Sequence, residues 1–69
     1  MELTILAGKK NTMFAIGGSR AEHEAIIEAC KRVHGGGCFC NYNKKRQLEF
    51  AAFAMPQVEA ALAALKATA

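Results

Sequence analysis

The order of apolar and polar segments repeats within this chain of 69 residues, and the repeat limits the folds that the chain can adopt. In each half, two short apolar segments separated by a polar linker precede a stretch with helical periodicity. At an offset of 35 residues, Lys9 aligns with Lys44 and Glu24 with Glu59. Because one hairpin and one helix cannot bury both a sheet face and a helix stripe, we expect the two units to pack together.

The first unit begins with a predicted β-hairpin. Apolar residues 3–7 and 12–16 flank a polar linker that holds a glycine and an asparagine. Ser19, followed three residues later by Glu22, forms the pattern of a capping box and predicts a helix N-terminus. The helix is expected to end at about residues 33–34, before three consecutive glycines.

The second unit repeats this order. Residues 38–42 and 48–54 predict another hairpin around the polar turn 43–47. Pro56 suits the first turn of a helix, where its missing N–H has no partner to lose. An apolar stripe at helical spacing follows it, formed by Val58, Leu62 and Leu65.

The repeated order predicts one α+β domain over residues 1–69, with pseudo-repeats at 3–34 and 38–69. The expected architecture is ββαββα, in which the two hairpin-helix units form a four-stranded antiparallel sheet with both helices on one face. The pattern leaves the strand order in the sheet open. It also leaves one sheet face without a covering layer.

Apolar side chains are expected on both faces of this sheet. Alternation along the last predicted strand places Leu48 and Phe50 on one face and Phe53 and Met55 on the other. Since only one set can face the helices, the other would form an exposed apolar patch, which favours a partner or homodimer surface. Scattered surface hydrophobic residues are the alternative interpretation.

Net charge and hydropathy indicate which partners and which cellular compartment fit this chain. Nine Lys and Arg against six acidic residues give a formal net charge of +3, which modestly favours anionic partners. No apolar run approaches the roughly 20 residues of a membrane span, and the start of the chain lacks the pattern of a secretory signal. The three cysteines are an odd number, which fits reduced thiols better than a disulfide scaffold. We therefore expect a cytoplasmic protein without a membrane partner.

Two basic turns are the candidate nucleic-acid contacts. The predicted hairpin tips carry adjacent cations that a phosphate backbone can reach, and Asn43 and Gln47 add hydrogen-bonding groups nearby. Lysine at a hairpin tip also promotes solubility and discourages edge pairing, which is the alternative explanation. If the two units are related by a pseudo-twofold axis, the tips lie at opposite ends of the sheet. The candidate binding residues are Lys9, Lys10, Phe39, Asn41, Tyr42, Lys44, Lys45 and Arg46.

A second candidate site is a set of zinc ligands. Three thiolates and one imidazole make a tetrahedral zinc site, and Cys30, His34, Cys38 and Cys40 supply these groups within a short segment. Their spacing matches no common zinc finger, and cysteine on an apolar helix stripe commonly fills a core. We therefore expect no cofactor, and the zinc-stabilised module stays a minor alternative.

The residues of an enzyme active site are not evident in this sequence. It contains no spacing typical of a carboxylate pair or a nucleophile-base-acid triad, and His23 is expected at the surface of the first helical turn. The sequence favours a small non-enzymatic binding protein that contacts nucleic acid through its basic turns. The alternative is a protein-binding inhibitor, such as a phage or plasmid anti-defence (anti-CRISPR-like) protein that acts on a nucleic-acid-processing complex.

Overall fold

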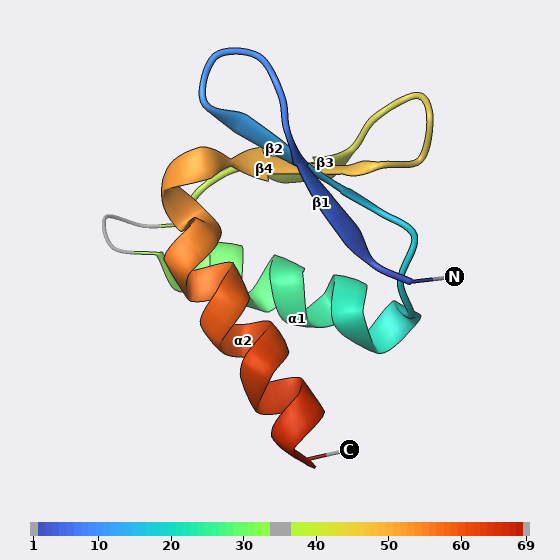
Figure 1. Cartoon of the computed structure of the whole chain (residues 1–69). Coiled ribbons are helices and arrows are strands. Elements are labelled where there is room, and N and C mark those ends of the chain that lie inside the picture. The colour runs from blue at the N-terminus through green and yellow to red at the C-terminus, as the bar shows by residue number, and fades with distance from the viewer. Residues whose placement is uncertain (1, 34–36, 69) are drawn as a thin grey trace.

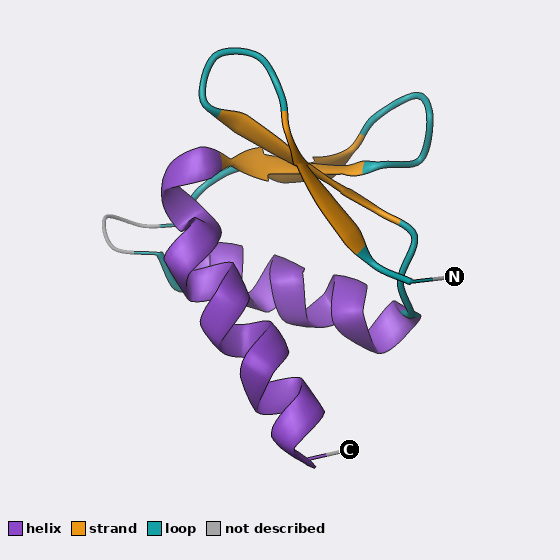
Figure 2. Cartoon of the chain, viewed as in Figure 1, coloured by secondary structure: helices purple, strands orange, loops and turns teal. Residues whose placement is uncertain are grey.

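A four-stranded antiparallel sheet and two helices make up the fold, in the order ββαββα (Figures 1 and 2). The computed structural model describes residues 2–33 and 37–68. The elements are β1 (Thr4–Ala7), β2 (Thr12–Ile16), α1 (Arg20–Lys31), β3 (Cys40–Tyr42), β4 (Leu48–Ala51), the short 3₁₀ helix η1 (Ala52–Ala54) and α2 (Met55–Thr68). The α+β class and the order of the elements that the sequence predicted are confirmed.

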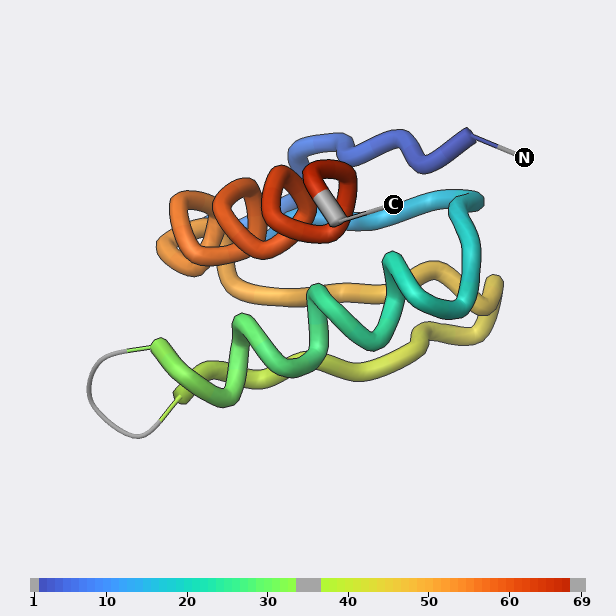
Figure 3. The backbone as a smooth tube through the Cα atoms, turned by 90° about the horizontal axis from the view of Figure 1, so that it is seen from below, coloured from blue at the N-terminus to red at the C-terminus, as the bar shows by residue number. Residues whose placement is uncertain are grey.

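The strand order is β1-β2-β4-β3, so β2 and β4 pair at the centre while β1 and β3 form the edges. Both helices lie on the same side of the sheet, and no helix or strand of the described residues covers the opposite face (Figure 1). Seen from below, α1 and α2 lie next to each other, with α2 toward β1 and α1 toward β3 (Figure 3). The strand order was not evident from the sequence, because apolar alternation alone does not choose a neighbour.

The two hairpins share one register. Ile5 pairs with Ala15 in the first hairpin and Cys40 pairs with Phe50 in the second, so both partners are shifted by the same 35 residues. The helices follow with the same spacing, since α1 begins 35 residues before α2. The repeat in the sequence therefore corresponds to a repeat in strand register and helix position.

Helix α1 begins where local chemistry predicts. The Ser19 hydroxyl accepts a hydrogen bond from the Glu22 backbone N–H at 3.2 Å, and the Glu22 carboxylate accepts one from the Ser19 N–H at 2.8 Å. This reciprocal pair satisfies two backbone donors that the helix itself leaves free. The helix ends at Lys31, slightly earlier than expected, and its buried face is formed by Ile26, Ala29 and Cys30.

Two predicted strand boundaries were wrong for a tertiary reason. Strand β4 ends at Ala51, whereas the sequence predicted a strand to residue 54, because Ala51 pairs with Thr12, the first residue of the partner strand β2, and beyond it the chain turns into η1. Strand β3 begins at Cys40 rather than at residue 38, because the Cys38 N–H bonds the Cys30 carbonyl of α1 at 2.9 Å. Helix α2 begins at Met55, which places Pro56 in its first turn as expected.

The core lies between the sheet and the helices. Its largest fully buried side chains are Phe50, Ile26, Leu48, Val58 and Cys30. Of the two sets that the sequence left open, Leu48 and Phe50 face the helices and form the centre of the core. Phe53 and Met55 do not continue the strand, because Phe53 lies in η1 and Met55 begins α2. Within the described part of the chain, neither helix has the length and apolar character that a membrane crossing requires.

Candidate functional site

The uncovered sheet face carries a row of four side chains, one from each strand. The strand registers place Leu6 beside Phe14, Phe14 beside Glu49, and Glu49 beside Asn41. Their sequence neighbours point to the helices, as side chains in strands alternate between faces. Leu6 is 48% exposed and Asn41 is exposed, while Phe14 and Glu49 are half-buried. We call this row and the sheet surface around it the open face.

The ring of Phe14 is positioned by a glycine at the end of the first hairpin. A Cβ atom on Gly8 would clash with Cε2 of the Phe14 ring and would lie 2.7 Å from the Thr12 hydroxyl oxygen. The ring therefore packs directly against the Gly8 backbone, a contact that only glycine permits. This packing fixes one aromatic ring near the middle of the open face.

The first basic turn is a tight β-turn with Lys10 and Asn11 at its centre. Both residues have positive φ, 49° and 60°, and the Thr12 N–H donates to the Lys9 carbonyl at 3.1 Å. Two central residues in this conformation define the type I′ turn, which matches the twist of a hairpin. The turn leaves the side chains of Lys9 and Lys10 exposed.

The second basic turn is stabilised by its own asparagine. The Asn43 side-chain oxygen accepts hydrogen bonds from the N–H groups of Lys45 and Gln47, both at 2.9 Å, and its amide nitrogen donates to the Gln47 side chain at 3.0 Å. Arg46 has a positive φ of 61°. Asn43 and Gln47 therefore hold the turn in shape, and Lys44, Lys45 and Arg46 remain exposed.

A shallow hollow lies between this second turn and the open face. It has a volume of about 440 Å³. Its sheet side is formed by Phe14 and Glu49, and its turn side by Asn43, Lys44, Lys45 and Gln47. The aromatic ring on the open face and two lysines of the second turn thus border the same depression.

The two basic turns lie at opposite ends of the sheet. Each turn immediately precedes a central strand, and these strands are antiparallel, with Thr12 beside Ala51 and Ala15 beside Leu48. Figure 1 shows the two loops projecting in different directions beyond the sheet. The cations therefore do not form one patch; they flank the open face from both ends.

Tyr42 lies on the other face of the sheet. It is paired with buried Leu48, and its hydroxyl lies 2.9 Å from Nδ1 of His23 on α1. The His23 Nε2 atom donates to the Gly17 carbonyl at 2.6 Å, since a carbonyl oxygen only accepts. His23 is half-buried and joins three segments, rather than lying free at the surface as the sequence predicted. Phe39 precedes β3 and is 46% exposed.

The three cysteines gather at the junction of α1 and β3. Burial raises the pKa of the Cys30 thiol far above its ordinary range, and hydrogen bonding to Cys38 raises it further. Burial also raises the pKa of Cys40. Protonated thiols are poor nucleophiles and poor metal ligands.

The predicted zinc set is not assembled in the part of the chain that the structure describes. In residues 2–33 and 37–68, no three His, Cys, Asp or Glu side chains are arranged to hold a metal ion. His34, the fourth member of the predicted set, lies outside the described residues. Cys30 is fully buried and belongs to the hydrophobic core.

Phe14, Leu6 and Glu49 were not among the residues that the sequence marked as a site. The signal was present in the alternation of β2, where Phe14 has the opposite parity to Ala15, a core residue with 1% exposure. What the sequence lacked was the strand order that sets Phe14 between Leu6 and Glu49. Comparisons with protein-family models, with curated proteins and with solved structures give no significant match.

Proposed function

We propose that this protein is a non-enzymatic module that binds single-stranded nucleic acid across its open face, with phosphate contacts at both basic turns. The observation that supports this proposal is the placement of two exposed basic turns at opposite ends of a sheet face that carries an aromatic ring between them. A strand lying across the face meets cations at both ends and Phe14 on the way.

Base stacking and contacts to phosphates would both contribute to the affinity. Base–aromatic stacking contributes about 1 to 3 kcal/mol per base and tolerates any sequence, because every base has a π-face. Lysine and arginine contacts to phosphates release counterions and make the affinity depend on salt. Phe14 would provide the first of these contributions, and Lys9, Lys10, Lys44, Lys45 and Arg46 the second.

A single strand fits this surface better than a duplex. Duplex readers commonly place a helix in the major groove, but both helices of this chain lie on the other side of the sheet (Figure 1). Unstacked bases, by contrast, can lie flat on aromatic side chains of an open sheet. Glu49, next to Phe14 in the row, disfavours a phosphate at the centre of the face and so favours bases there.

Three titratable side chains of the described residues, His23, Cys30 and Cys40, are hydrogen-bonded or buried within the fold, which supports a binding function. His23 is engaged at both ring nitrogens by Tyr42 and Gly17. The thiols of Cys30 and Cys40 have raised pKa values because they are buried, which disfavours the nucleophilic thiolate.

Fluorescence anisotropy with a labelled oligonucleotide tests the proposal. Single-stranded DNA, single-stranded RNA and a duplex, each of about 12 nucleotides, are titrated at roughly 50 and 200 mM salt. We expect both single strands to bind more tightly than the duplex. Lys9→Ala/Lys10→Ala and Lys44→Ala/Lys45→Ala should each weaken binding and flatten the salt dependence by about one unit of slope per lost phosphate contact.

The matched control removes two cations from the helical side of the molecule. Lys31 and Arg32, at the end of α1, are exposed, and Lys31→Ala/Arg32→Ala changes the net charge by the same amount as each turn variant. Affinity should persist in this control. Equal losses in the control and the turn variants would show nonspecific charge attraction and overturn the proposal. Absence of binding at low salt would also overturn it and would favour the protein-binding inhibitor.

A further inference from the structure

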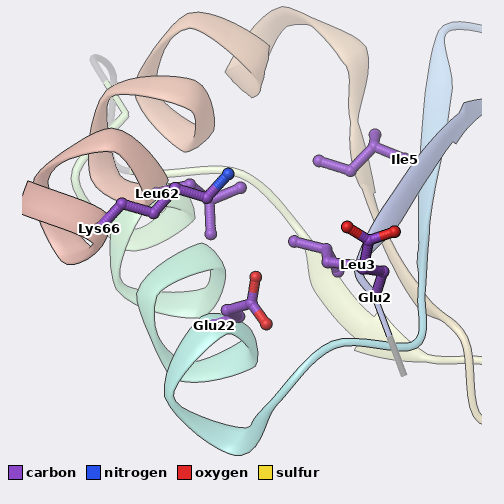
Figure 4. A pocket seen from close by; sticks show the side chains of 6 residues that line it. All are labelled: Glu2, Leu3, Ile5, Glu22, Leu62 and Lys66. Atoms are coloured by element: carbon purple, nitrogen blue, oxygen red, sulfur yellow. The ribbon is translucent and has the colours of Figure 1, made fainter. Parts of the chain in front are cut away.

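A cleft on the helical side of the molecule separates β1 from α2 (Figure 4). It has a volume of about 560 Å³. Leu3 and Ile5 line it from the β1 side and Leu62 from the α2 side, so its walls are aliphatic (Figure 4). The remaining lining residues are charged: Glu2, Glu22 and Lys66.

The cleft exists because α2 leaves the sheet before it covers the edge strand. Figure 1 shows α2 descending away from the sheet toward its C-terminal end. Val58 is fully buried, but no residue from 59 to 67 is, and Leu62 is only half-buried. Leu3 and Ile5, which face the same side, are also half-buried. Aliphatic side chains thus remain uncovered on both sides of the cleft.

Next to the cleft, β1 presents an unprotected strand edge. β1 is the outermost strand, and within residues 2–33 and 37–68 its one strand partner is β2. Its four residues, Thr4–Ala7, include neither a charge nor a proline, which are common devices against edge-to-edge pairing. Free backbone N–H and C=O groups and uncovered aliphatic side chains therefore lie along the same margin of the molecule.

The charges around the cleft are of both signs and are not paired with one another. Among the described residues, ion pairs join Arg20 to Glu24 and Lys31 to Glu28, and none joins Lys66 to Glu2 or Glu22. A surface that carries both signs is complementary to a twofold-related copy of itself where the axis sets each charge opposite one of the other sign. Glu2 and Lys66 are both exposed, so they can reach a neighbouring molecule.

We infer that a second copy of this chain closes the cleft, through antiparallel pairing of β1 with the same strand of the other copy. A twofold axis perpendicular to the sheet makes one continuous eight-stranded sheet from the two four-stranded ones. All helices then lie on one face, and the α2 helices of the two copies approach each other over Leu3, Ile5 and Leu62. Lys66 of each copy meets the acidic side of the other cleft.

The size of the chain is compatible with this interface. A standard interface buries about 800 Å² per partner, and the accessible surface of this chain is 4934 Å². The interface would therefore cover about a sixth of the surface. It would leave the open face free, so the inference does not depend on the proposed nucleic-acid function.

Sedimentation equilibrium without nucleic acid, up to about 1 mM protein, tests the dimer. We expect the dissociation constant to rise at least tenfold in Lys66→Glu and in Glu2→Lys, because each creates like charges across the twofold axis. An equimolar mixture of the two variants should recover a mixed dimer, since each copy then offers the charge that the other needs. Only a contact between chains produces this recovery.

Two controls make the result specific. Lys44→Glu makes the same charge reversal on the second turn, away from the cleft, and should leave dimerisation unchanged. Circular dichroism checks that each variant is folded. A wild-type chain that stays monomeric throughout the concentration range overturns the inference. So does a dimer that withstands Lys66→Glu but dissociates in Phe14→Lys, because that result places the interface on the open face.

Discussion

The Tyr42 hydroxyl lies 2.9 Å from Nδ1 of His23, which joins the edge strand β3 to the first turns of α1. The two rings are tilted, with centroids 5.8 Å apart. Because Nε2 of His23 donates to the Gly17 carbonyl, the neutral imidazole leaves Nδ1 to accept the proton of the Tyr42 hydroxyl. The His23 side chain therefore links both the β2–α1 loop and strand β3 to helix α1.

Tyr42→Phe removes this hydrogen bond and leaves the ring. We expect the free energy of unfolding to fall by about 0.5 kcal/mol, the low end for a hydrogen bond, because Tyr42 is 53% exposed. Urea unfolding followed by circular dichroism measures the change. Affinity for single-stranded nucleic acid should be unchanged, since Tyr42 lies on the face opposite to Phe14. Unchanged stability together with weakened binding would contradict the assignment of Tyr42 to a structural role.

Gly8→Ala places a methyl group against the Phe14 ring. We expect a loss of about 1 to 3 kcal/mol in the free energy of unfolding, because the ring and the turn must shift to admit the added atom. The same substitution in a Phe14→Leu background should cost less, because the clashing ring atoms are gone. A double-mutant cycle from urea unfolding measures the coupling. If Gly8→Ala lowers the free energy of unfolding equally in both backgrounds, the Phe14 ring does not determine which residue is tolerated at position 8.

Cys30 should make stability fall at alkaline pH. Burial raises its pKa in the folded chain above the ordinary value of 9.0, so the unfolded chain loses the thiol proton first. The stabilisation is complete below pH 9 and decreases as the pH rises above 9, by at most about 1.4 kcal/mol per pH unit. Urea unfolding at several pH values above and below 9 measures this slope.

The comparison protein for this slope is Cys30→Ala, which lacks the buried thiol. The difference between their slopes reports the Cys30 thiol together with its effect on Cys40, whose pKa is also raised by burial and which hydrogen-bonds Cys30. We expect a shallower decline in Cys30→Ala. A decline as steep as that of the wild type would mean that the Cys30 thiol ionises equally easily in the folded and unfolded chains.

Glu49→Gln removes the carboxylate from the centre of the open face. If nucleic acid lies across this face with its bases over Phe14 and its phosphates farther from Glu49, affinity at low salt should rise by about twofold, since like charges about 8 Å apart repel by roughly 0.5 kcal/mol in water. The gain should shrink as salt screens the repulsion. Anisotropy titrations measure it, and Glu59→Gln, an exposed glutamate on α2, provides the same charge change elsewhere. An equal gain in both variants would place the bound strand away from Glu49.

Local signals in the sequence predicted the elements well. Ser19 and Glu22 are three residues apart and complete their capping box within one helical turn, so no distant contact was needed to place the start of α1. The predicted turn at 43–47 is likewise closed by its own residues, through the Asn43 side chain. Prediction failed at 52–54, where the strand ends because its partner β2, distant in the sequence, offers no strand residue beyond Thr12, which pairs with Ala51.

For the same reason, the sequence identified only the basic turns of the candidate site. The exposed lysines of each turn are adjacent in sequence and were identified as binding candidates. The position of Phe14 in the site depends instead on contacts with Leu6, Glu49 and Gly8. The row across the open face joins residues from four strands, and their neighbourhood depends on the order β1-β2-β4-β3. A pattern read along one strand carries no information about which strand lies beside it.

By itself, the sequence determined the doubled hairpin-helix order, because capping, turn formation and apolar periodicity act over a few neighbouring residues. The tertiary structure decided which face of the sheet is open, which aromatic ring lies on it, and where α2 leaves β1 uncovered. Those outcomes depend on packing between segments far apart in the chain, where the burial of Phe50 and Leu48 against the helices selects one face for the core. The open face and the side of β1 that α2 leaves uncovered, which are proposed here to bind nucleic acid and a second copy, are the surfaces that this packing leaves exposed.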